Sequence, residues 1–295
     1  MLRYGQGAKQ SMGYSRWTLA DLHVHTPADK AQRYGDVGGR EPNDAFAEAL
    51  IKTHAERGVK IMAVTDHNRV DWWPSLYAAG RRHGVTVFPG LEVNVTKCHV
   101  VMIWDCNEGG YERAEYYLGS LFGPGQKLLN PDQSPRAIEK GSVLDQAENA
   151  HKTGALVFAA HATHTSMGLF GHGVCNISSS VAKSEFILGF DVWGSPGCDV
   201  LSNPRTEFGD RRPAWFMAGD TRSLDTVGRR ATYLKVCEQP SLESLRQAFL
   251  MPDTRIRLMA EHRNKWGHTR HAKFLEMPTA SWGHAQRITI AGGFH

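Results

Sequence analysis

Short apolar runs alternate along the chain with segments whose apolar residues recur at helical spacing. Seven of the runs have the length and bounding residues of strands, and they cover 18–25, 60–67, 85–93, 98–105, 154–162, 186–194 and 213–222. Between the first two, residues 41–58 place Phe46, Leu50 and Ile51 on one face of a helix that ends at Gly58. Such alternation is typical of β/α units around a mostly parallel sheet. The pattern therefore predicts an α/β barrel.

Two regions depart from this alternation. Residues 106–141 hold a predicted helix around 111–122 and then a Gly- and Pro-rich connection, which we interpret as a surface excursion in preference to a lid over a site. After the seventh strand, residues 229–258 have the pattern strand, helix, strand. The expected domains are an N-terminal extension over 1–17, one barrel over 18–258 and a basic C-terminal extension over 259–295.

Composition fits one barrel-sized domain with a large core. The chain has 295 residues, 41% of them hydrophobic, and a formal net charge of +4, an excess too small to imply nucleic-acid binding by itself. No stretch approaches about 18 consecutive apolar residues and no signal peptide opens the chain, so we expect a soluble, cytoplasmic protein with no membrane partner. The five cysteines form no C-x-x-C pair, which favours reduced, mostly buried thiols over a disulfide framework or a thiolate zinc site.

Residues with metal-binding side chains gather at the strand ends. In "DLHVHT", Asp21, His23 and His25 alternate and so project from one face of a strand. A chain with 15 histidines contains roughly one His-x-His pair by chance, so this motif alone decides nothing. Further candidates lie at or near the ends of the other runs: Asp66, His67, Glu92, His99, His161 and Asp220. Because the C-terminal ends of parallel barrel strands meet at one rim, the pattern predicts a shared metal site there.

Histidine and carboxylate ligands without cysteine suit Mn²⁺, Zn²⁺ or Fe²⁺. A carboxylate shared by two ions lets them hold one water between them, and that water becomes hydroxide near neutral pH. Ions ~3.5–4 Å apart present the hydroxide to phosphorus and neutralise the phosphate oxygens during an in-line displacement. The candidate residues therefore indicate hydrolysis of phosphate esters.

The order and spacing of several motifs resemble a known family. "DLHVHT", "VTDHN", "PGLEV" followed by "CHVV", "AAHA" and "AGDTR" are similar to the motifs of the PHP (polymerase and histidinol phosphatase) family of metal-dependent phosphoesterases. The resemblance covers about residues 18–236 and implies a distorted (β/α)7 barrel with two or three divalent ions at its C-terminal rim. "SRWTLADLHVHTPAD" and "GRRATYLKV" most resemble PHP domains that precede an AAA-like or SMC-like ATPase.

The resemblance assigns ligands to two ions residue by residue. The implied ligands are His23, His25 and Asp220 for the first ion, and Glu92, His99 and His161 for the second, with Glu92 bridging the two.

A third ion position would be served by His67, and two departures from the family pattern affect it. Where the family's last motif commonly reads G-S-D-x-H, this chain has "GDTR", so Arg222 stands in the place of a histidine ligand. The ligand usually found shortly after His25 is either Asp29 or Asp36. A guanidinium repels a divalent cation where water is scarce, so we expect two well-ordered ions and a weak or vacant third position.

Three further residues are candidates for roles in the reaction. Arg222 has the planar donors to grip a phosphate, or it forms an ordinary ion pair with a neighbouring carboxylate. His164, in "AHATHT", is either a proton donor to the leaving group or a loop histidine without a role. We expect Asp66 to orient a ligand histidine, and His54 to be a packed or half-exposed histidine of its helix.

The sequence thus predicts a metal-dependent phosphoesterase acting on a phosphomonoester, a nucleotide or a nucleic-acid phosphodiester. The alternative is a non-catalytic metal-containing sensor or binding module attached to an ATPase. We also expect the chain to be joined to a longer partner, because "RITIAGGF" near its end is similar to the opening of the ATPase domain in the resembling proteins. The chain itself contains no G-x-x-x-x-G-K-[ST] phosphate-binding loop.

Overall fold

The computed structural model describes residues 15–28, 40–95, 98–123, 127–131, 134–139, 141–164, 168–170, 179–193, 208 and 211–259. The predicted C-terminal extension beyond residue 259, Asp29 and Asp36 lie outside these residues. In chain order the elements are β1 (Arg16–Val24), α1 (Asp44–Glu56), β2 (Val59–Val64), α2 (Trp73–His83), β3 (Thr86–Val95), β4 (Cys98–Ile103), α3 (Glu108–Phe122), α4 (Val143–Lys152), β5 (Leu156–Ala159), α5 (Ser179–Lys183), β6 (Ile187–Asp191), β7 (Ala214–Phe216), β8 (Thr232–Val236), α7 (Leu242–Leu250), α8 (Pro252–Arg255) and β9 (Ile256–Leu258).

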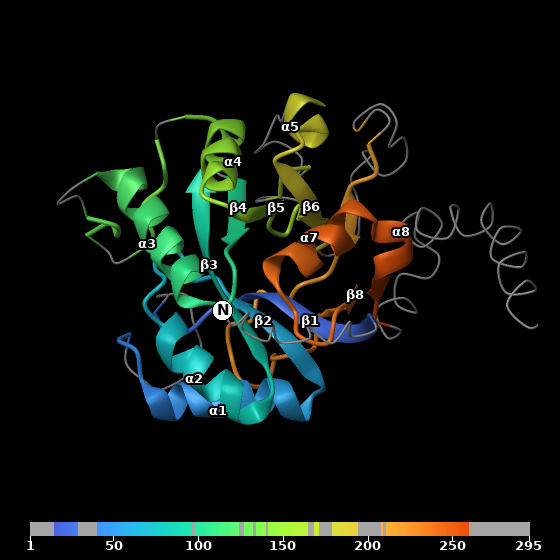
Figure 1. Cartoon of the computed structure of the whole chain (residues 1–295). Helices are drawn as coiled ribbons and strands as arrows, with labels where there is room; N and C mark the ends of the chain where they lie inside the picture. Colours follow the sequence, from blue (N-terminus) through green and yellow to red (C-terminus); the bar gives the residue numbers. More distant parts are fainter. Residues whose placement is uncertain are drawn as a thin grey trace, which may run out of the picture.

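The strands form one strongly curved sheet in the order β7-β6-β5-β4-β3-β2-β1-β8-β9 (Figure 1). β7 at one edge also contacts β9 at the other, so the sheet is a nearly closed barrel. The predicted α/β barrel is confirmed, and all seven predicted strands are present. The sheet has nine strands because β8 and β9, the predicted closing pair, add to the outer side of β1.

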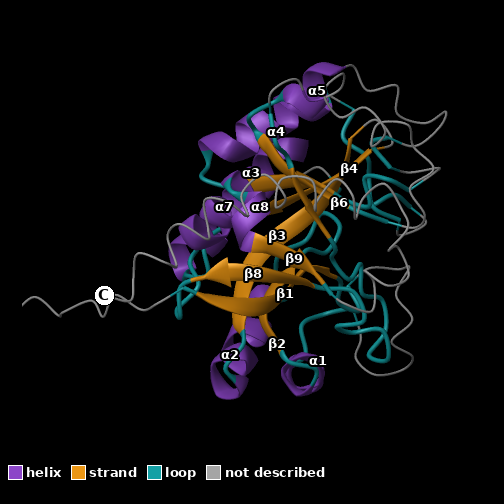
Figure 2. Cartoon of the chain, turned by 90° about the vertical axis from the view of Figure 1, so that its right-hand side faces the viewer, coloured by secondary structure: helices purple, strands orange, loops and turns teal. Residues whose placement is uncertain are grey.

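Two strands of the barrel, β4 and β8, run against both of their neighbours. β1, β2 and β3 are parallel, and so are β5, β6 and β7, but β4 is antiparallel to both β3 and β5. The start of β4 therefore lies at the end where the parallel strands finish, and His99 pairs with Asn94 near the end of β3. Loops gather on one side of the strands, to the right in Figure 2.

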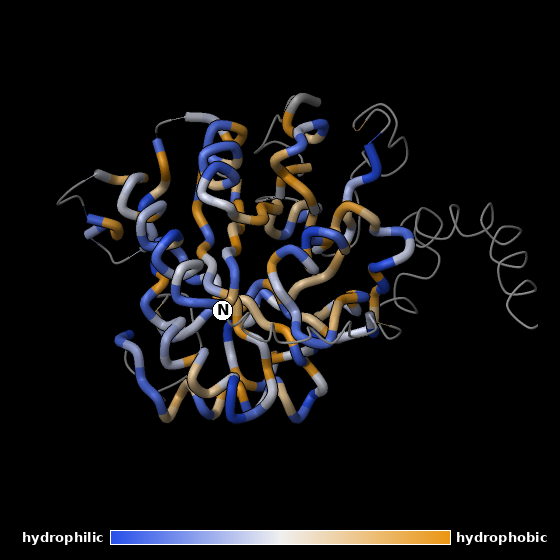
Figure 3. The backbone as a smooth tube through the Cα atoms, viewed as in Figure 1, coloured by the Kyte–Doolittle hydropathy of each residue, from blue (hydrophilic) through white to orange (hydrophobic). Residues whose placement is uncertain are grey.

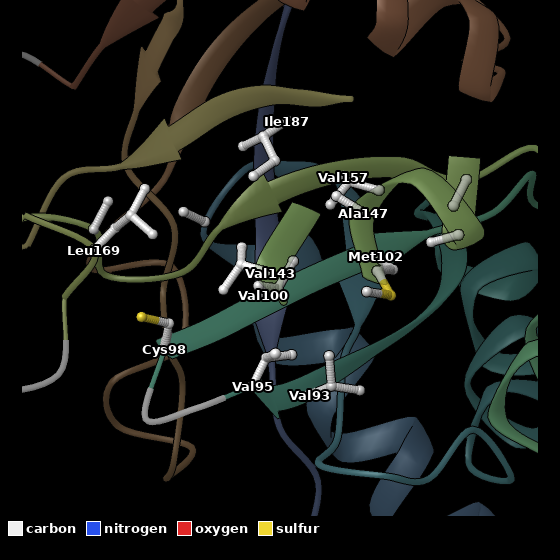
Figure 4. Close-up of a cluster of buried hydrophobic side chains, with 14 of the residues drawn as sticks. Val93, Val95, Cys98, Val100, Met102, Val143, Ala147, Val157, Leu169 and Ile187 are labelled. Atoms are coloured by element: carbon white, nitrogen blue, oxygen red, sulfur yellow. The ribbon is translucent and has the colours of Figure 1, made fainter. Parts of the chain in front are cut away.

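Helices pack around the barrel and bury apolar faces against it. In α1, Asn43 caps the first turn by accepting the Phe46 N–H at 3.0 Å, and Phe46, Leu50 and Ile51 are buried as predicted. Hydrophobic positions lie along the strands (Figure 3), and side chains of β3, β4 and β5 meet those of α4 in one cluster (Figure 4). Within the described residues, no helix combines the length and apolarity needed to cross a bilayer.

The excursion between α3 and α4 is attached to the barrel rim where it is described. Asn68 Nδ2 donates to the carbonyls of Leu128 at 3.0 Å and Arg136 at 2.8 Å. The Ile138 N–H donates to Asn94 O at 2.8 Å. Because Asn68 follows His67 directly, this segment borders the predicted site, which the interpretation as a simple surface excursion did not anticipate.

Two sequence expectations need correction. The strands predicted over 154–162 and 213–222 are much shorter: β5 ends at Ala159 and β7 ends at Phe216. Beyond these ends the backbone adopts positive φ at His161 (φ 30°) and Asp220 (φ 43°). Cys98 is disulfide-bonded, so the expectation that all cysteines are reduced is wrong for this residue. The absence of a C-x-x-C pair argues against a local bridge only, and folding brings cysteines together that are distant in sequence.

We predict that Gly189 in β6 is required for packing inside the barrel. A Cβ at this position would lie 2.5 Å from Phe249 Cε1 and 3.1 Å from Phe216 Cε1. Gly189→Ala should therefore lower the free energy of unfolding by about 1–3 kcal/mol, as measured by chemical denaturation.

The matched control is Gly119→Ala in α3, where a Cβ meets nothing within 4 Å. It should raise the free energy of unfolding by about 0.4–1 kcal/mol. Equal effects of the two substitutions would contradict the packing argument.

Candidate metal centre

Histidines from several strand ends converge on one buried carboxylate. Glu92 on β3 has no exposed surface. The nearest imidazole nitrogens are His23 Nε2 at 3.0 Å, His25 Nε2 at 3.1 Å and His67 Nε2 at 3.2 Å from Glu92 Oε2, and His99 Nδ1 at 2.7 Å and His161 Nε2 at 3.4 Å from Glu92 Oε1. One carboxylate oxygen thus faces three imidazoles and the other faces two.

Seven of the eight predicted ligands lie in three adjoining groups, each with ligand atoms within 4.8 Å of one another. The groups are His23, His25 and Asp220; His25, His67 and Glu92; and Glu92, His99 and His161. The eighth, Asp29, lies outside the described residues. The first and third groups have the same members as the two ligand sets that the resemblance implies.

The electrostatics of this cluster fit divalent cations. Burial alone would raise the pKa of Glu92, but the charges of the surrounding histidines, His67 first, hold it well below its ordinary value. Burial lowers the pKa of His23, but the nearby Glu92 carboxylate outweighs burial and raises it. Nδ1 of His23 and Nδ1 of His161 are buried without a hydrogen-bond partner among the described residues. Buried imidazoles around ionised carboxylates are a donor set that Mn²⁺, Zn²⁺ or Fe²⁺ satisfies.

Arg222 is paired with a predicted ligand. Its Nε lies 3.1 Å from Asp220 Oδ1, and its Nη2 lies 3.2 Å from Oδ2. Asp220 also faces His25 Nε2 at 3.3 Å. Burial raises the pKa of Asp220, but the hydrogen bond from His25 and the histidine charges lower it well below its ordinary value. Of the two sequence interpretations of Arg222, the ion pair is present, while 37% of its side chain remains exposed at the rim.

The two other candidates flank the cluster. Asp66 accepts the Thr26 N–H and the Thr26 hydroxyl, each at 2.7 Å, and its Oδ1 lies 3.8 Å from His25 Nδ1. It is absent from the three ligand groups and lies where it can orient His25. The His164 ring centroid is 6.2 Å from that of His161. Burial and the His161 charge lower the pKa of His164.

Comparisons with known proteins agree with this architecture. No family model matches the chain. It is 29% identical over 216 residues to the PolC-type DNA polymerase III of Listeria welshimeri, which covers 70% of this chain and 14% of the polymerase. It is 30% identical over 129 residues to the PolC-type DNA polymerase III of Streptococcus pyogenes, covering 43% of this chain and 8% of that protein. The chain therefore spans a small part of these relatives.

Two solved structures have a similar fold. A lesion-specific endonuclease of Pyrococcus furiosus matches 83% of this chain and 58% of its own, with a TM-score of 0.57 and 15% identity. A two-domain protein of Bacteroides vulgatus that contains a predicted PHP-like metal-dependent phosphoesterase matches 82% of this chain and 67% of its own, with a TM-score of 0.52 and 12% identity. The fold is a PHP-type barrel. The more specific likeness to PHP domains that precede an ATPase stays a prediction.

In this PHP-type barrel, Asp21 holds the turn that carries Asp220. Asp21 Oδ1 accepts the Gly219 N–H at 2.7 Å and the His23 N–H at 3.4 Å, and Oδ2 lies 3.8 Å from His54 Nε2. His54 is fully buried, as expected for a packed histidine, and its Nδ1 lies 2.9 Å from the Leu50 carbonyl. A Cβ at residue 219 would lie 2.4 Å from Asp21 Oδ2, so glycine permits this close contact.

Asp191, which the sequence analysis missed, supports the same part of the PHP-type barrel's rim, because it accepts the N–H of Ala218, next to Gly219. It ends β6, is fully buried, and accepts the N–H groups of His161 at 3.2 Å and Ala218 at 3.0 Å. Its Oδ1 also lies 3.5 Å from Arg230 Nη2. Burial raises the pKa of Asp191, against the opposing Arg230 charge. An acidic residue at the end of the sixth predicted strand was the available signal, the same one that marked Glu92.

We predict that Asp21 positions ligands without being one. Asp21→Asn replaces the carboxylate that accepts the Gly219 N–H by a weaker amide acceptor and removes the charge that faces His54, so the turn carrying Asp220 should loosen. Mn²⁺ affinity, measured by isothermal titration calorimetry, should fall about 10- to 100-fold while the circular dichroism spectrum is unchanged.

Asp44→Asn is the matched control for this substitution. Asp44 is exposed in the first turn of α1, so its loss should leave Mn²⁺ affinity at the wild-type value. Wild-type affinity in Asp21→Asn would contradict the positioning role.

We also predict opposite pH trends for the metal-free and metal-loaded protein. The pKa values of His23 and His25 are raised in the fold, so their contribution to stability is complete below about pH 6.5 and is lost as pH rises through the raised values. Mn²⁺ competes with the same protons, so its stabilisation should grow with pH. Thermal unfolding between about pH 6 and pH 8 should show a difference in Tm, with and without Mn²⁺, that increases with pH. A difference that shrinks would contradict the assignment of these histidines as ligands.

Proposed function

We propose that this chain hydrolyses phosphate esters with the help of divalent metal ions, and that phosphodiesters of nucleic acids or nucleotides are its preferred substrates over phosphomonoesters. The observation that carries the proposal is the buried Glu92 carboxylate, which lies between the first and third ligand groups. Its Oε2 faces His23 and His25 of the first group, and its Oε1 faces His99 and His161 of the third. A shared carboxylate is the arrangement that keeps two ions close enough to act on one phosphate.

We propose two ions, Mn²⁺, Zn²⁺ or Fe²⁺, rather than three. The middle group consists of His67 together with His25, which also belongs to the first group, and Glu92, which also belongs to the third. An imidazole nitrogen that binds one ion is not available to another, so His25 cannot serve both the first and the middle position. His67 then serves as an additional ligand at the edge of the pair. Arg222, held on Asp220, adds a positive charge beside the same region and disfavours a third cation.

When bound, the ions supply an activated water and positive charge for the phosphate oxygens. In the net reaction a water oxygen would replace the leaving oxygen on phosphorus, and the proton that the water gives up would end on the leaving group. Arg222 keeps Asp220 oriented and presents the exposed part of its guanidinium to the phosphate. Asp66 holds His25 through Thr26. His164 is the candidate proton donor, although its lowered pKa makes this role effective only below neutral pH.

The comparisons support nucleic acid as the substrate class. One protein of similar fold is a lesion-specific endonuclease, and the relatives in sequence are DNA polymerases. Each of these proteins is named as a nucleic-acid enzyme, whereas the alternative of a non-catalytic sensor attached to an ATPase has no counterpart among them. We propose that the chain works beside, or within, a larger nucleic-acid enzyme.

We predict that His23→Ala and Asp220→Ala each abolish phosphoesterase activity without unfolding the barrel. The assay uses the full chain with Mn²⁺ on 4-nitrophenyl phosphate, bis(4-nitrophenyl) phosphate, nucleotides and single-stranded DNA. Loss of a ligand should lower the activity by more than the ~10- to 100-fold expected for a residue that only hydrogen-bonds to a ligand. The reason is that the site then binds its ions weakly.

His151→Ala is the matched control, because His151 is exposed in α4 and should have no effect. Metal content is measured in parallel by elemental analysis, with two ions per chain expected. Stoichiometric metal with no hydrolysis of any substrate would overturn the proposal and favour the non-catalytic module.

A further inference from the structure

A tryptophan stands beside the metal centre at the end of β6. Trp193 follows that strand by two residues and is partly buried. Its ring centroid lies 6.5 Å from that of His161 and 6.5 Å from that of His164. The indole is therefore next to a member of the Glu92, His99 and His161 group, yet neither the fold nor the hydrolysis proposed above uses it.

The main chain of Trp193 is fixed to the segment that carries His161. Its N–H donates to Thr163 Oγ1 at 2.8 Å, and the Thr163 hydroxyl donates to the Trp193 carbonyl at 2.7 Å. Thr163 is only 2% exposed. This double contact fixes the main chain from which the indole projects, so little ordering of the backbone is needed when a ligand arrives.

Arg230 supports the indole ring from one side. Its guanidinium carbon lies 4.2 Å from the ring centroid of Trp193. Nε donates to Ala218 O at 2.9 Å, Nη2 donates to Val192 O at 2.5 Å, and the side chain is 17% exposed. A guanidinium held by these acceptors is engaged with the protein, and its effect is to hold the ring in place by a cation–π contact.

A rigid indole beside a phosphate-binding centre suits a nucleobase. Bases stack on aromatic side chains with little dependence on sequence, because every base has a π face. A nucleotide carries its base one sugar away from phosphorus, so an ester held near His161 has its base within reach of Trp193. A simple phosphate ester would leave this ring without a contact.

We propose that Trp193, supported by Arg230, is the stacking surface for an unpaired nucleobase next to the phosphate being hydrolysed. This inference rests on the proposed phosphoesterase function and makes Trp193 a residue that determines specificity. It predicts that the nucleoside part of a substrate contributes to binding through this ring, and that the metal centre itself does not depend on it.

A second Arg–Trp pair in the structure provides an internal control. Arg257 lies 4.1 Å from the ring of Trp17, a geometry close to that of Arg230 on Trp193. Trp17 is near the start of β1, at the end of the strand opposite His23. Trp17→Ala therefore removes a similar contact far from the metal centre.

The test compares substrates that share a leaving group and differ in the nucleoside. Wild type, Trp193→Ala, Trp193→Phe and Trp17→Ala, each as the full chain with Mn²⁺, are assayed on methyl 4-nitrophenyl phosphate and on the 5′- and 3′-(4-nitrophenyl phosphate) esters of thymidine. Trp193→Ala should raise KM for at least one thymidine ester about tenfold, the lower part of the range for one lost base stack, with kcat little changed. Trp193→Phe should have a smaller effect, and the methyl ester should be hydrolysed as by wild type.

Parallel assays on single-stranded oligonucleotides identify the source of the base. A loss with oligonucleotides alone assigns the stacked base to a strand, and a loss with the thymidine esters as well assigns it to the nucleotide itself. Equal losses on the methyl and thymidine esters, or equal effects of Trp17→Ala and Trp193→Ala, would overturn the inference while the proposed function stands. Inactivity of wild type on every ester would overturn the proposed function, and the inference with it.

Discussion

The architecture of the site depends on one constraint, the burial of the Glu92 carboxylate among five imidazoles. A carboxylate without exposed surface is stable only when its charge is compensated and its oxygens have partners. The histidines supply both when they carry protons, and divalent cations supply both when the histidines are neutral. The charge of Glu92 can therefore be compensated in two ways, by protonated histidines or by cations. This explains how side chains that are otherwise costly to bury can lie within a few ångströms of one another before any ion binds.

The barrel meets this constraint by bringing chain segments of opposite direction to one rim. His23 and His25 arrive at the end of a parallel strand, whereas His99 arrives at the start of the antiparallel β4. His161 and Asp220 lie beyond strands that end early, and both residues adopt positive φ. This backbone conformation is costly for a residue with a side chain. Two hydrogen bonds offset that cost: the His161 N–H donates to Asp191, and the N–H of Gly219, next to Asp220, donates to Asp21. The supporting aspartates therefore belong to the site as much as the candidate ligands do.

Much of this could be predicted from the sequence, because the ligand side chains sit where apolar strand patterns end. Period-two alternation located His23 and His25, and the position of Glu92 at the end of a strand marked it in the same way. The direction of β4 could not be predicted, because alternation is the same in parallel and antiparallel strands. Asp191 was missed for a different reason: its role consists of accepting main-chain N–H groups of distant residues, and sequence patterns do not report such contacts. The disulfide at Cys98 likewise depends on tertiary proximity.

The charge balance of the centre indicates why an arginine is tolerated where the resembling family has a histidine ligand. The two proposed divalent cations would bring four positive charges to a site whose candidate ligand carboxylates, Glu92 and Asp220, supply two negative ones. Neutral histidines would add nothing to this balance, so a site loaded in this way would be cationic and would attract the anionic phosphate ester of the proposed reaction. A histidine in place of Arg222 would favour a further cation, whereas the guanidinium supplies one fixed positive charge and donors that match phosphate oxygens. Because Arg222 lies against Asp220 while part of its side chain is exposed, the proposed contact with a substrate phosphate would not require it to leave Asp220.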